Sequence, residues 1–322
     1  MLLKKLIKNC PKSFINLKIN GLSLNSKSLK KGHLFFALKG KKFNGEKFIQ
    51  EAILNGAKAI VCSSNCKFKS KKIAIIKTKK LKSALILACK NYYNKKPKNI
   101  IAVTGTNGKT SVAGFYNQLL TLNKIPVASI GTLGIMRGKT INKSHLTSPD
   151  IISLHKELQK LKEKNIDNVI IEASSHGLQQ GRLDGINFKA GIFTNFTQDH
   201  LDYHKSMKNY LNAKLILFNK LLTKKNYIIS DKNNKEFKKL KNIAIKRKLE
   251  IISIKKKSYS KEINESNLVG EFQTKNLLMA ILAAKLSKIK DRDISSALNQ
   301  IQPINGRLSL IKTLPNNAKV FI

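Results

Sequence analysis

Short apolar runs alternate with amphipathic stretches along most of the chain, and this pattern predicts strands and helices in turn. In the first third the predicted strands are 32–38, 57–62 and 73–76, and the predicted helices are 48–55 and 80–93. Gly56 follows the first helix as a natural C-cap. The polar, proline-bearing segment 94–98 is predicted to be a domain boundary.

Beyond this boundary the alternation is more regular. The predicted strands are 100–103, 127–130, 169–171, 191–194 and 227–229, and the predicted helices are 111–122, 150–164 and 207–222. Such a βαβ rhythm predicts an α/β fold with a doubly wound, mainly parallel sheet that binds ligands at the carboxyl ends of its strands. The expected organisation is a small N-terminal α/β domain at 1–93, a central domain at 94–306 and a stub at 307–322.

The last residues form a predicted turn and two short apolar strands, 308–312 and 318–322. A domain seldom stops on a bare apolar strand. We therefore interpret the end of the chain as the start of a further domain.

Composition narrows the class of protein. The 322 residues, with 42% hydrophobic and 25% charged residues, suit two globular domains. There is no apolar run of 18 residues and no signal-peptide core, so a cytoplasmic location is expected. The four cysteines lack the spacing of a zinc site and are expected to be reduced.

The net charge of +44 raises nucleic-acid binding as an alternative function. The lysines are spread along the whole chain, however, and no basic arm with interleaved aromatic residues stands out. We interpret the charge as a compositional bias and expect only weak, non-specific binding to polyanions.

The clearest chemical signal is the segment Thr104-Gly105-Thr106-Asn107-Gly108-Lys109-Thr110, which joins the strand at 100–103 to the helix at 111–122. Backbone N–H groups and the helix dipole in such a turn attract phosphate, Lys109 adds a counter-charge, and the Thr110 hydroxyl suits Mg²⁺. The glycines are closer together than in the usual phosphate loop, as in a few ATP-using families. The sequence predicts that the chain binds ATP.

Polar clusters follow two further strands. Glu172 ends the strand at 169–171, where a nucleotide-bound Mg²⁺ is usually held; a surface glutamate is the alternative. Segment 195–204 carries two aspartates and two histidines, which suit metal or acid–base chemistry, or a solvated turn. Lys214 lies on an apolar helical stretch, and its periodicity alone predicts a side chain that extends to solvent.

Four segments together resemble the Mur ligases of peptidoglycan synthesis, and most of all those that add the third residue of the stem peptide. They are TGTNGKTS (104–111), EASSHGL (172–178), FTNFTQDHLDYH (193–204) and AK (213–214). Segment 25–37 is similar to the uridine-nucleotide-binding start of that family. The resemblance implies an ATP-dependent ligase that joins meso-diaminopimelate, or alternatively L-lysine, to UDP-N-acetylmuramoyl-L-alanyl-D-glutamate through an acyl phosphate.

The resemblance also assigns roles to individual residues. The residues implied for ATP are Gly105, Thr106, Asn107, Gly108, Lys109, Thr110, Ser111, Asn276 and Arg307. Thr110 and Glu172 would bind one Mg²⁺, and His200 would bind a second beside Lys214, which is carbamylated in this family. Lys109, Lys214 and His200 are the implied catalytic residues. The positions implied for the UDP-substrate are Leu24, Ser26, Lys41, Lys42, Phe43, Thr147, Ser148, Ser174, Gln180 and Arg182, of which 41–43 depart from the family's more polar residues.

The family also has a third, Rossmann-like domain that selects the incoming amino acid, and this domain is expected to be absent from the chain. Two interpretations follow from that expectation: half of a split ligase that needs a separate chain, or an inactive nucleotide-binding remnant. A folylpolyglutamate synthetase is a further alternative, but it would lack the predicted uridine-binding domain.

Overall fold

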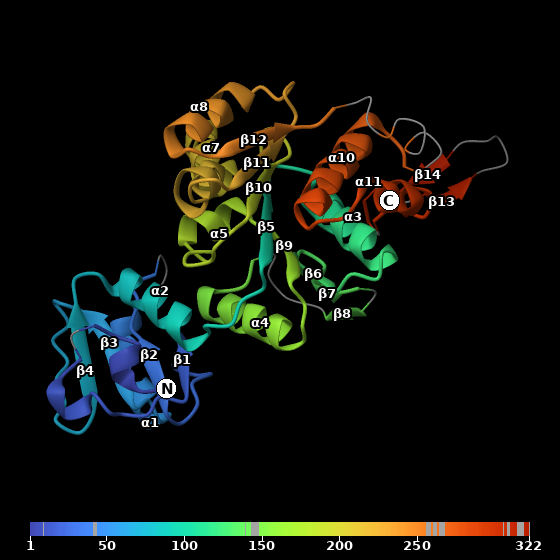
Figure 1. Ribbon diagram of the computed structural model, residues 1–322. Helices are drawn as coiled ribbons and strands as arrows, with labels where there is room; N and C mark the ends of the chain where they lie inside the picture. Colours follow the sequence, from blue (N-terminus) through green and yellow to red (C-terminus); the bar gives the residue numbers. More distant parts are fainter. Residues whose placement is uncertain are drawn as a thin grey trace. The chain divides into compact units, whose positions relative to one another are not determined.

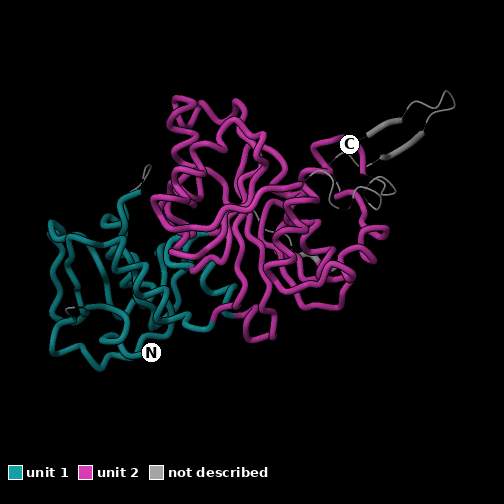
Figure 2. The backbone as a smooth tube through the Cα atoms, turned by 45° about the horizontal axis from the view of Figure 1, so that its top comes forward, with its two compact units in different colours: residues 1–95, 150–159, 184–186 teal, residues 96–149, 160–183, 187–322 magenta. Residues whose placement is uncertain are grey.

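The computed structural model describes residues 1–8, 10–40, 44–138, 140–142, 148–255, 259, 263, 268–304, 306–307, 310–313 and 319–321. Two compact units are evident in Figure 2. The first comprises residues 1–95, 150–159 and 184–186, and the second comprises 96–149, 160–183 and 187–322.

The first unit is built on a parallel four-stranded sheet in the order β1-β2-β3-β4 (Figure 1). Its strands are β1 (Gly21–Ser23), β2 (His33–Phe36), β3 (Ala59–Ser63) and β4 (Ala74–Thr78). Its helices are η1 (Leu3–Lys5), η2 (Lys12–Phe14), η3 (Gly45–Phe48), α1 (Ile49–Leu54) and α2 (Leu81–Tyr92). Alternate strand residues enter different apolar clusters: Phe36 and Val61 one, Phe35 and Ile60 the other. The sheet is therefore buried on both faces, as parallel sheets usually are.

The second unit contains an eight-stranded sheet in the order β12-β11-β10-β5-β9-β6-β7-β8 (Figure 1). The strands are β5 (Asn99–Thr104), β6 (Val127–Gly131), β7 (Gly134–Arg137), β8 (Thr140–Asn142), β9 (Asn168–Glu172), β10 (Ala190–Phe193), β11 (Tyr227–Ser230) and β12 (Glu250–Ser253). The first six in the spatial order are parallel, while β7 and β8 form an antiparallel edge. The α/β class and the mainly parallel sheet predicted from the sequence are confirmed.

The second unit also contains helices. They are α3 (Lys109–Leu122), α5 (Ser175–Gln180), α6 (Leu201–His204), α7 (Met207–Ile216), α8 (Phe237–Arg247), α10 (Glu271–Leu286) and α11 (Asp291–Leu298), with the π-helical turn η4 (Leu217–Leu221). Helix α4 (Ile151–Glu163) is divided, because its residues 151–159 belong to the first unit. Helices α3 and α10 share the main apolar cluster with strands β5, β9 and β10. A buried hydrogen bond of 2.8 Å between the hydroxyls of Tyr116 and Ser287 links α3 to the end of α10.

Several predicted bounds need correction. Helix α3 begins at Lys109, not at residue 111, so the lysine of the loop already belongs to the helix. The helix predicted at 207–222 ends at Ile216 and continues as a π-helical turn. The antiparallel strands β7 and β8 and the helices α8, α10 and α11 were not predicted. Strands β13 (Leu310–Thr313) and β14 (Lys319–Phe321) pair antiparallel with each other.

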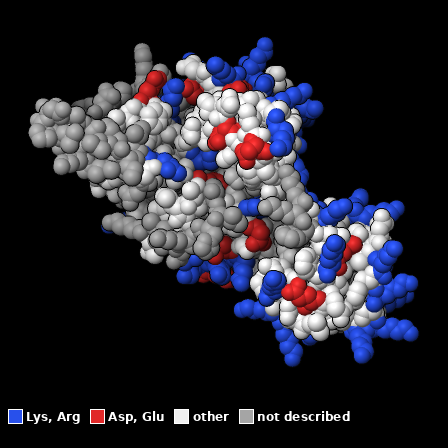
Figure 3. Space-filling view, turned by 180° about the vertical axis from the view of Figure 1, so that it is seen from behind, with Lys and Arg blue, Asp and Glu red and all other residues white. Residues whose placement is uncertain are grey.

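The distribution of charge, the hydropathy of the helices and the state of the cysteines bear on the class of protein. Lys and Arg side chains are scattered over the face shown in Figure 3 and do not gather in one patch. Within the described ranges, none of the helices is long and apolar enough to cross a lipid bilayer. All four cysteines are free thiols, as expected.

Candidate functional site

The glycine-rich turn after β5 has a backbone that requires its two glycines. Gly108 lies in the left-handed region, with φ of 84°, directly before α3. A Cβ atom on Gly105 would lie 1.8 Å from the Thr194 hydroxyl. Side chains at either position would therefore distort the turn.

The turn is held in place by the segment that follows β10. Thr194 Oγ1 donates to the Asn107 carbonyl at 2.6 Å, and Asn195 Oδ1 accepts from the Asn107 N–H at 2.9 Å. The register explains this proximity, because Phe193 and Thr104 are partners at the carboxyl ends of adjacent parallel strands. These hydrogen bonds fix the position of the loop relative to β10, which lowers the cost of ordering it on binding.

Glu172 ends β9 beside the loop and is 2% exposed. Its Oε2 accepts from the hydroxyls of Thr110 and Thr132, both at 3.0 Å, and its Oε1 accepts from the Thr132 N–H at 2.9 Å. Gly131 makes room for the carboxylate, because a Cβ there would lie 2.0 Å from Oε1. Hydroxyl and carboxylate oxygens in one cluster form a donor set that suits Mg²⁺.

Lys214 is 1% exposed, so the prediction from periodicity that it extends to solvent is wrong. Its Nζ donates to the Gly105 carbonyl at 2.6 Å and lies 4.3 Å from the centre of the Tyr210 ring. Burial lowers the pKa of Lys214 to about 7, with the charge of Lys109 adding to the fall. Helix α7 therefore points this amine at the phosphate loop instead of at water.

Lys109 is a second amine at the loop, and its side chain is half-buried. Its Nζ donates to the carbonyls of Gly105 and Thr106 at 2.9 and 2.7 Å. Burial lowers the pKa of Lys109, while the carboxylates of Glu172 and Asp199 oppose that change. Two amines thus converge on one carbonyl, that of Gly105, and an anion placed here would relieve their mutual repulsion.

His200 lies in the segment after β10 with a left-handed backbone, φ 52°. Its side chain is about half exposed, and its Nε2 is 3.4 Å from Asp199 Oδ2. The rings of His176 and Tyr210 pack near it, with centroids at 5.1 and 5.9 Å. Among the residues that the structure describes, no three His, Cys, Asp or Glu side chains form a metal-binding group. Any ion here would thus need oxygen ligands of other kinds.

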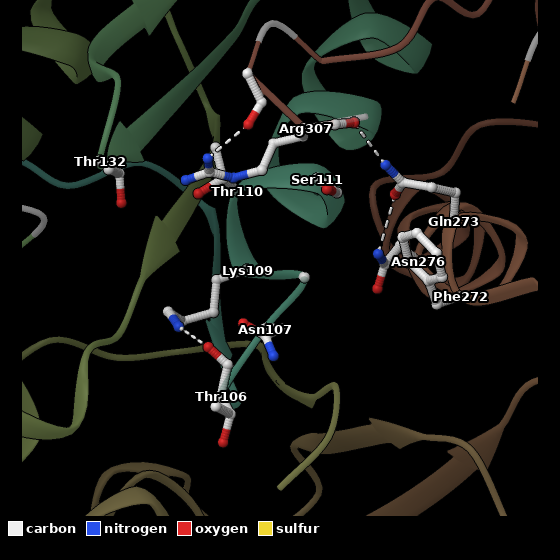
Figure 4. A pocket seen from close by; sticks show the side chains of 12 residues that line it. Thr106, Asn107, Lys109, Thr110, Ser111, Thr132, Phe272, Gln273, Asn276 and Arg307 are labelled. Atoms are coloured by element: carbon white, nitrogen blue, oxygen red, sulfur yellow. Dashed lines mark hydrogen bonds between the residues drawn. The ribbon is translucent and has the colours of Figure 1, made fainter. Parts of the chain in front are cut away.

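A cavity of about 370 Å³ opens in front of the loop (Figure 4). The N-terminus of α3 and the first turns of α10 line it, together with the turn at 306–307. Of the residues predicted to bind ATP, the lining includes Thr106, Asn107, Gly108, Lys109, Thr110, Ser111, Asn276 and Arg307. Gly105 is the exception: this loop residue packs against Thr194 and does not line the cavity.

Four of the residues predicted to bind substrate form one hydrogen-bonded group. Ser148 Oγ lies 3.2 Å from Ser174 Oγ, and Arg182 donates to the Ser148 carbonyl at 2.7 Å and to Gln180 Oε1 at 2.9 Å. Ser148 Oγ also donates to the Glu172 carbonyl at 3.0 Å, which connects this group to β9.

The other predicted substrate positions are in the first unit or cannot be placed. Ser26 is buried there and donates to Glu51 Oε2 at 2.8 Å, and Leu24 packs on the apolar cluster. Lys41, Lys42, Phe43 and Thr147 lie outside the described residues.

Family profiles match both parts of the chain. The profile described as Mur ligase family, catalytic domain, matches residues 18–103, and the profile described as Mur ligase middle domain matches residues 103–284. The chain belongs to the Mur ligase family. The resemblance predicted from the motifs is confirmed.

Individual Mur ligases are similar to this chain over nearly its whole length. The UDP-N-acetylmuramoyl-L-alanyl-D-glutamate--2,6-diaminopimelate ligase of Rickettsia montanensis is 34% identical, over 98% of this chain and 70% of its own length. A solved structure of a ligase of the same name has a TM-score of 0.80 at 23% identity, over 97% of this chain and 69% of its own. The chain thus spans about 70% of the length of these relatives.

The folylpolyglutamate synthetase alternative has weaker support. The Mycobacterium tuberculosis folylpolyglutamate synthase, solved in complex with ADP, has a TM-score of 0.57 at 13% identity and covers 74% of this chain and 65% of its own. The likeness at this identity shows a shared fold only.

Four residues around the Mur ligase phosphate loop were missed by the sequence analysis: Thr132, Tyr210, Phe272 and Gln273. Two had a signal in the sequence. Thr132 follows strand β6 at the same carboxyl edge as Glu172, and Gln273 precedes Asn276 by one helical turn. Tyr210 and Phe272 had no signal, because an aromatic residue on a helix ordinarily belongs to a core.

Proposed function

We propose that this Mur ligase chain takes part in ATP-dependent amide formation, joining meso-diaminopimelate to the D-glutamyl carboxylate of UDP-N-acetylmuramoyl-L-alanyl-D-glutamate. One observation carries the proposal: a phosphate loop, a buried carboxylate, the buried amine of Lys214 and the half-buried amine of Lys109 meet at the carboxyl edge of one parallel sheet. The names of the relatives supply the substrates. Because ATP and UDP-linked precursors are cytoplasmic metabolites, we place the reaction in the cytoplasm.

The loop residues 105–111 are proposed to hold the phosphates of ATP, and Asn276 and Arg307 its nucleoside end. The N-terminus of α3 supplies backbone N–H groups and positive dipole, and Lys109 supplies a full charge. The folylpolyglutamate synthase with the same fold was solved with ADP, which supports a nucleotide here.

Thr110 and Glu172 are proposed to hold Mg²⁺, because their oxygens already lie 3.0 Å apart at the mouth of the loop. His200 and a carbamylated Lys214 are proposed for a second ion. Bound Mg²⁺ would neutralise phosphate charge and polarise the transferred phosphoryl group.

The environment of Lys214 suits carbamylation. A pKa of about 7 leaves a large share of the amine neutral at physiological pH. The neutral nitrogen attacks the carbon of CO₂ and loses one proton, and this converts a cation into an anion with two oxygens. That change would also remove the repulsion between Lys214 and Lys109.

The chemistry is two successive displacements. The D-glutamyl carboxylate attacks the γ-phosphorus of ATP, which releases ADP and leaves an acyl phosphate. The incoming amino group then attacks the acyl carbon, and phosphate leaves with the bonding electrons while the amine loses a proton. Lys109 and the loop N–H groups stabilise the charge that develops on the phosphoryl oxygens. The chain therefore acts mainly by positioning the reactants and neutralising this charge.

Substrate is proposed to bind through Leu24, Ser26 and residues 41–43 of the first unit, and through Thr147, Ser148, Ser174, Gln180 and Arg182. Residues 1–93 are proposed as the uridine-binding domain and 94–306 as the ATP domain. Ser148, Ser174 and Arg182 are already joined by hydrogen bonds, so a phosphate or carboxylate group would meet a preformed polar surface.

The test traps the acyl phosphate. The chain is incubated with ATP, Mg²⁺, UDP-N-acetylmuramoyl-L-alanyl-D-glutamate and hydroxylamine, and the hydroxamate is measured. Hydroxylamine replaces the incoming amino acid, so the assay reports only the first step. Hydroxamate that depends on Lys109 supports the proposal; a wild-type chain that forms none, or a Lys109→Met variant that forms as much, contradicts it.

A further inference from the structure

One hydroxyl at the start of the phosphate loop is buried without a hydrogen-bond partner. Thr104 ends β5 and is fully buried. Among the residues that the structure describes, no group forms a hydrogen bond with its Oγ1. A buried hydroxyl is costly to leave unpaired, so an unpaired one needs a physical reason. One such reason is a group that is added to the site after the chain has folded.

Three other hydroxyls beside the loop already donate their protons. Thr106 Oγ1 donates to a backbone carbonyl at 3.1 Å, and the Tyr210 hydroxyl donates to Thr106 Oγ1 at 3.3 Å. Thr194 Oγ1 donates to the loop backbone at 2.6 Å. A new acceptor at this place could take a proton from any of these three only by breaking an existing hydrogen bond, whereas the Thr104 hydroxyl is available.

The register of the sheet shows which way Thr104 points. Thr104 and Phe193 are partners on adjacent parallel strands, so their side chains lie on the same face of the sheet. Phe193 packs against Phe218, with ring centroids 6.0 Å apart, and Phe218 follows Lys214 by one helical turn. Val103 enters the apolar cluster of α3 and α10 on the opposite face (Figure 1). The Thr104 hydroxyl therefore lies on the face that α7 and η4 cover.

Lys214 reaches the residue next to Thr104 from the same face. Its Nζ donates to the Gly105 carbonyl at 2.6 Å. Carbamylation forms a bond between this Nζ and the carbon of CO₂, breaks one C–O π bond and releases one proton to water. The carbamate nitrogen keeps one N–H, which is enough for the Gly105 carbonyl. Its two oxygens are negatively charged acceptors, and in a buried place they need donors.

We infer that Thr104 is a positioning residue whose hydroxyl donates a hydrogen bond to the carbamate of Lys214. The hydroxyl is a buried donor without an acceptor, and the modification brings acceptors to the same face of β5. A hydrogen bond to a charged oxygen is roughly twice as strong as one between neutral groups, so it favours the modified amine. The inference rests on the proposed function, since it requires the carbamylation that is proposed there.

The experiment measures the carbamate itself. The full chain is titrated with ¹³C-labelled bicarbonate, and the carbamate carbon is followed by ¹³C NMR. The signal that is missing from Lys214→Met belongs to Lys214. Thr104→Val keeps the shape of the side chain but removes the donor, and it should need about tenfold more CO₂ for half occupancy. Thr104→Ser restores a hydroxyl and should return close to the wild-type value.

Ser230 offers a matched control in the same row of the sheet. It is the partner of Phe193 on β11, it is fully buried, and its Oγ donates to the Phe193 carbonyl at 2.9 Å. Ser230→Ala should therefore lower the free energy of unfolding in urea and leave the CO₂ requirement unchanged. Thr104→Val should do the reverse: in CO₂-free buffer it should be at least as stable as wild type, because its hydroxyl has no hydrogen bond to lose.

The outcomes separate the two claims. If the wild type gives no signal that Lys214→Met removes, the proposed carbamylation falls and this inference falls with it, while the hydroxamate assay still tests the ligase step. If the wild type is modified but Thr104→Val needs no more CO₂, or Thr104→Ser needs as much as Thr104→Val, only the role of Thr104 is overturned. A Thr104→Val chain that does not fold, or that is less stable in CO₂-free buffer, also overturns the assignment, because the hydroxyl would then have another partner.

Discussion

The buried amine of Lys214 should make the stability of the folded chain depend on pH. The folded-state pKa is about 7, against 10.5 for an exposed lysine. Between these values the unfolded chain binds a proton that the folded chain does not, so the free energy of unfolding rises with pH across this window. Below pH 7 the amine is protonated in both states, and the folded state bears the full cost of burying the charged amine.

The size of the penalty follows from the same two values. Each pH unit between them corresponds to about 1.4 kcal/mol, which gives a ceiling of about 5 kcal/mol. A methionine at this position would lose the hydrogen bond to the Gly105 carbonyl and the contact with the Tyr210 ring, and each loss costs about 1 kcal/mol. Replacing Lys214 by methionine should therefore stabilise the chain by about 3 kcal/mol at pH 6.5.

The assay is urea unfolding followed by circular dichroism from pH 6.5 to 10.5, in buffers free of CO₂ so that the amine stays unmodified. The gain in stability of Lys214→Met over wild type should shrink steadily as the pH rises. Lys208→Met, an exposed lysine on the same helix, is the matched control and should show no such trend. A gain for Lys214→Met that is constant with pH, or a variant less stable than wild type at pH 6.5, would refute the reasoning.

Three further predictions concern the carboxylate cluster and the packing of α3. Gly131→Ala would place a Cβ 2.0 Å from Glu172 Oε1 and should weaken Mg²⁺-dependent ATP binding at least tenfold, measured by titration calorimetry; unchanged binding would show that the carboxylate position is unimportant. Thr132→Val keeps the N–H to Glu172 but removes the hydroxyl, and should lower the free energy of unfolding by about 1 kcal/mol in a urea titration; a loss below a few tenths would contradict this. Tyr116→Phe breaks the buried hydrogen bond to Ser287 and should lower the melting temperature while the ATP dissociation constant stays the same; a large change in that constant would be inconsistent with a purely structural role.

The parts of the fold that the sequence predicts well are those decided by local pattern. The run at 100–103 is apolar at every position because β5 is central in a parallel sheet and is buried on both faces. The glycine spacing of the loop is equally local, because Gly108 must take a left-handed backbone before α3. Strands near the edge of the sheet, such as β7, are short and half-buried, so they leave no comparable signal.

The rest of the site depends on tertiary packing. Periodicity alone predicts that Lys214 is solvated, because it cannot register that α7 packs with this position against the loop. Helix α10 is buried nearly all round, so it shows no amphipathic pattern from which Gln273 and Asn276 would stand out. The resemblance to the Mur ligases supplied the roles of Lys214 and Asn276, whereas the place of Gln273 beside Asn276 required the hydrogen bond between them in the structure.

The central claim is that the loop and Glu172 together hold a magnesium-bound nucleotide. Calorimetric titration of ATP into wild type and Glu172→Gln, with Mg²⁺ and then with EDTA, tests it most directly. The account predicts that Glu172→Gln loses at least tenfold in affinity with Mg²⁺ and little in EDTA. Equal affinity of the two proteins for ATP in the presence of Mg²⁺ would contradict it.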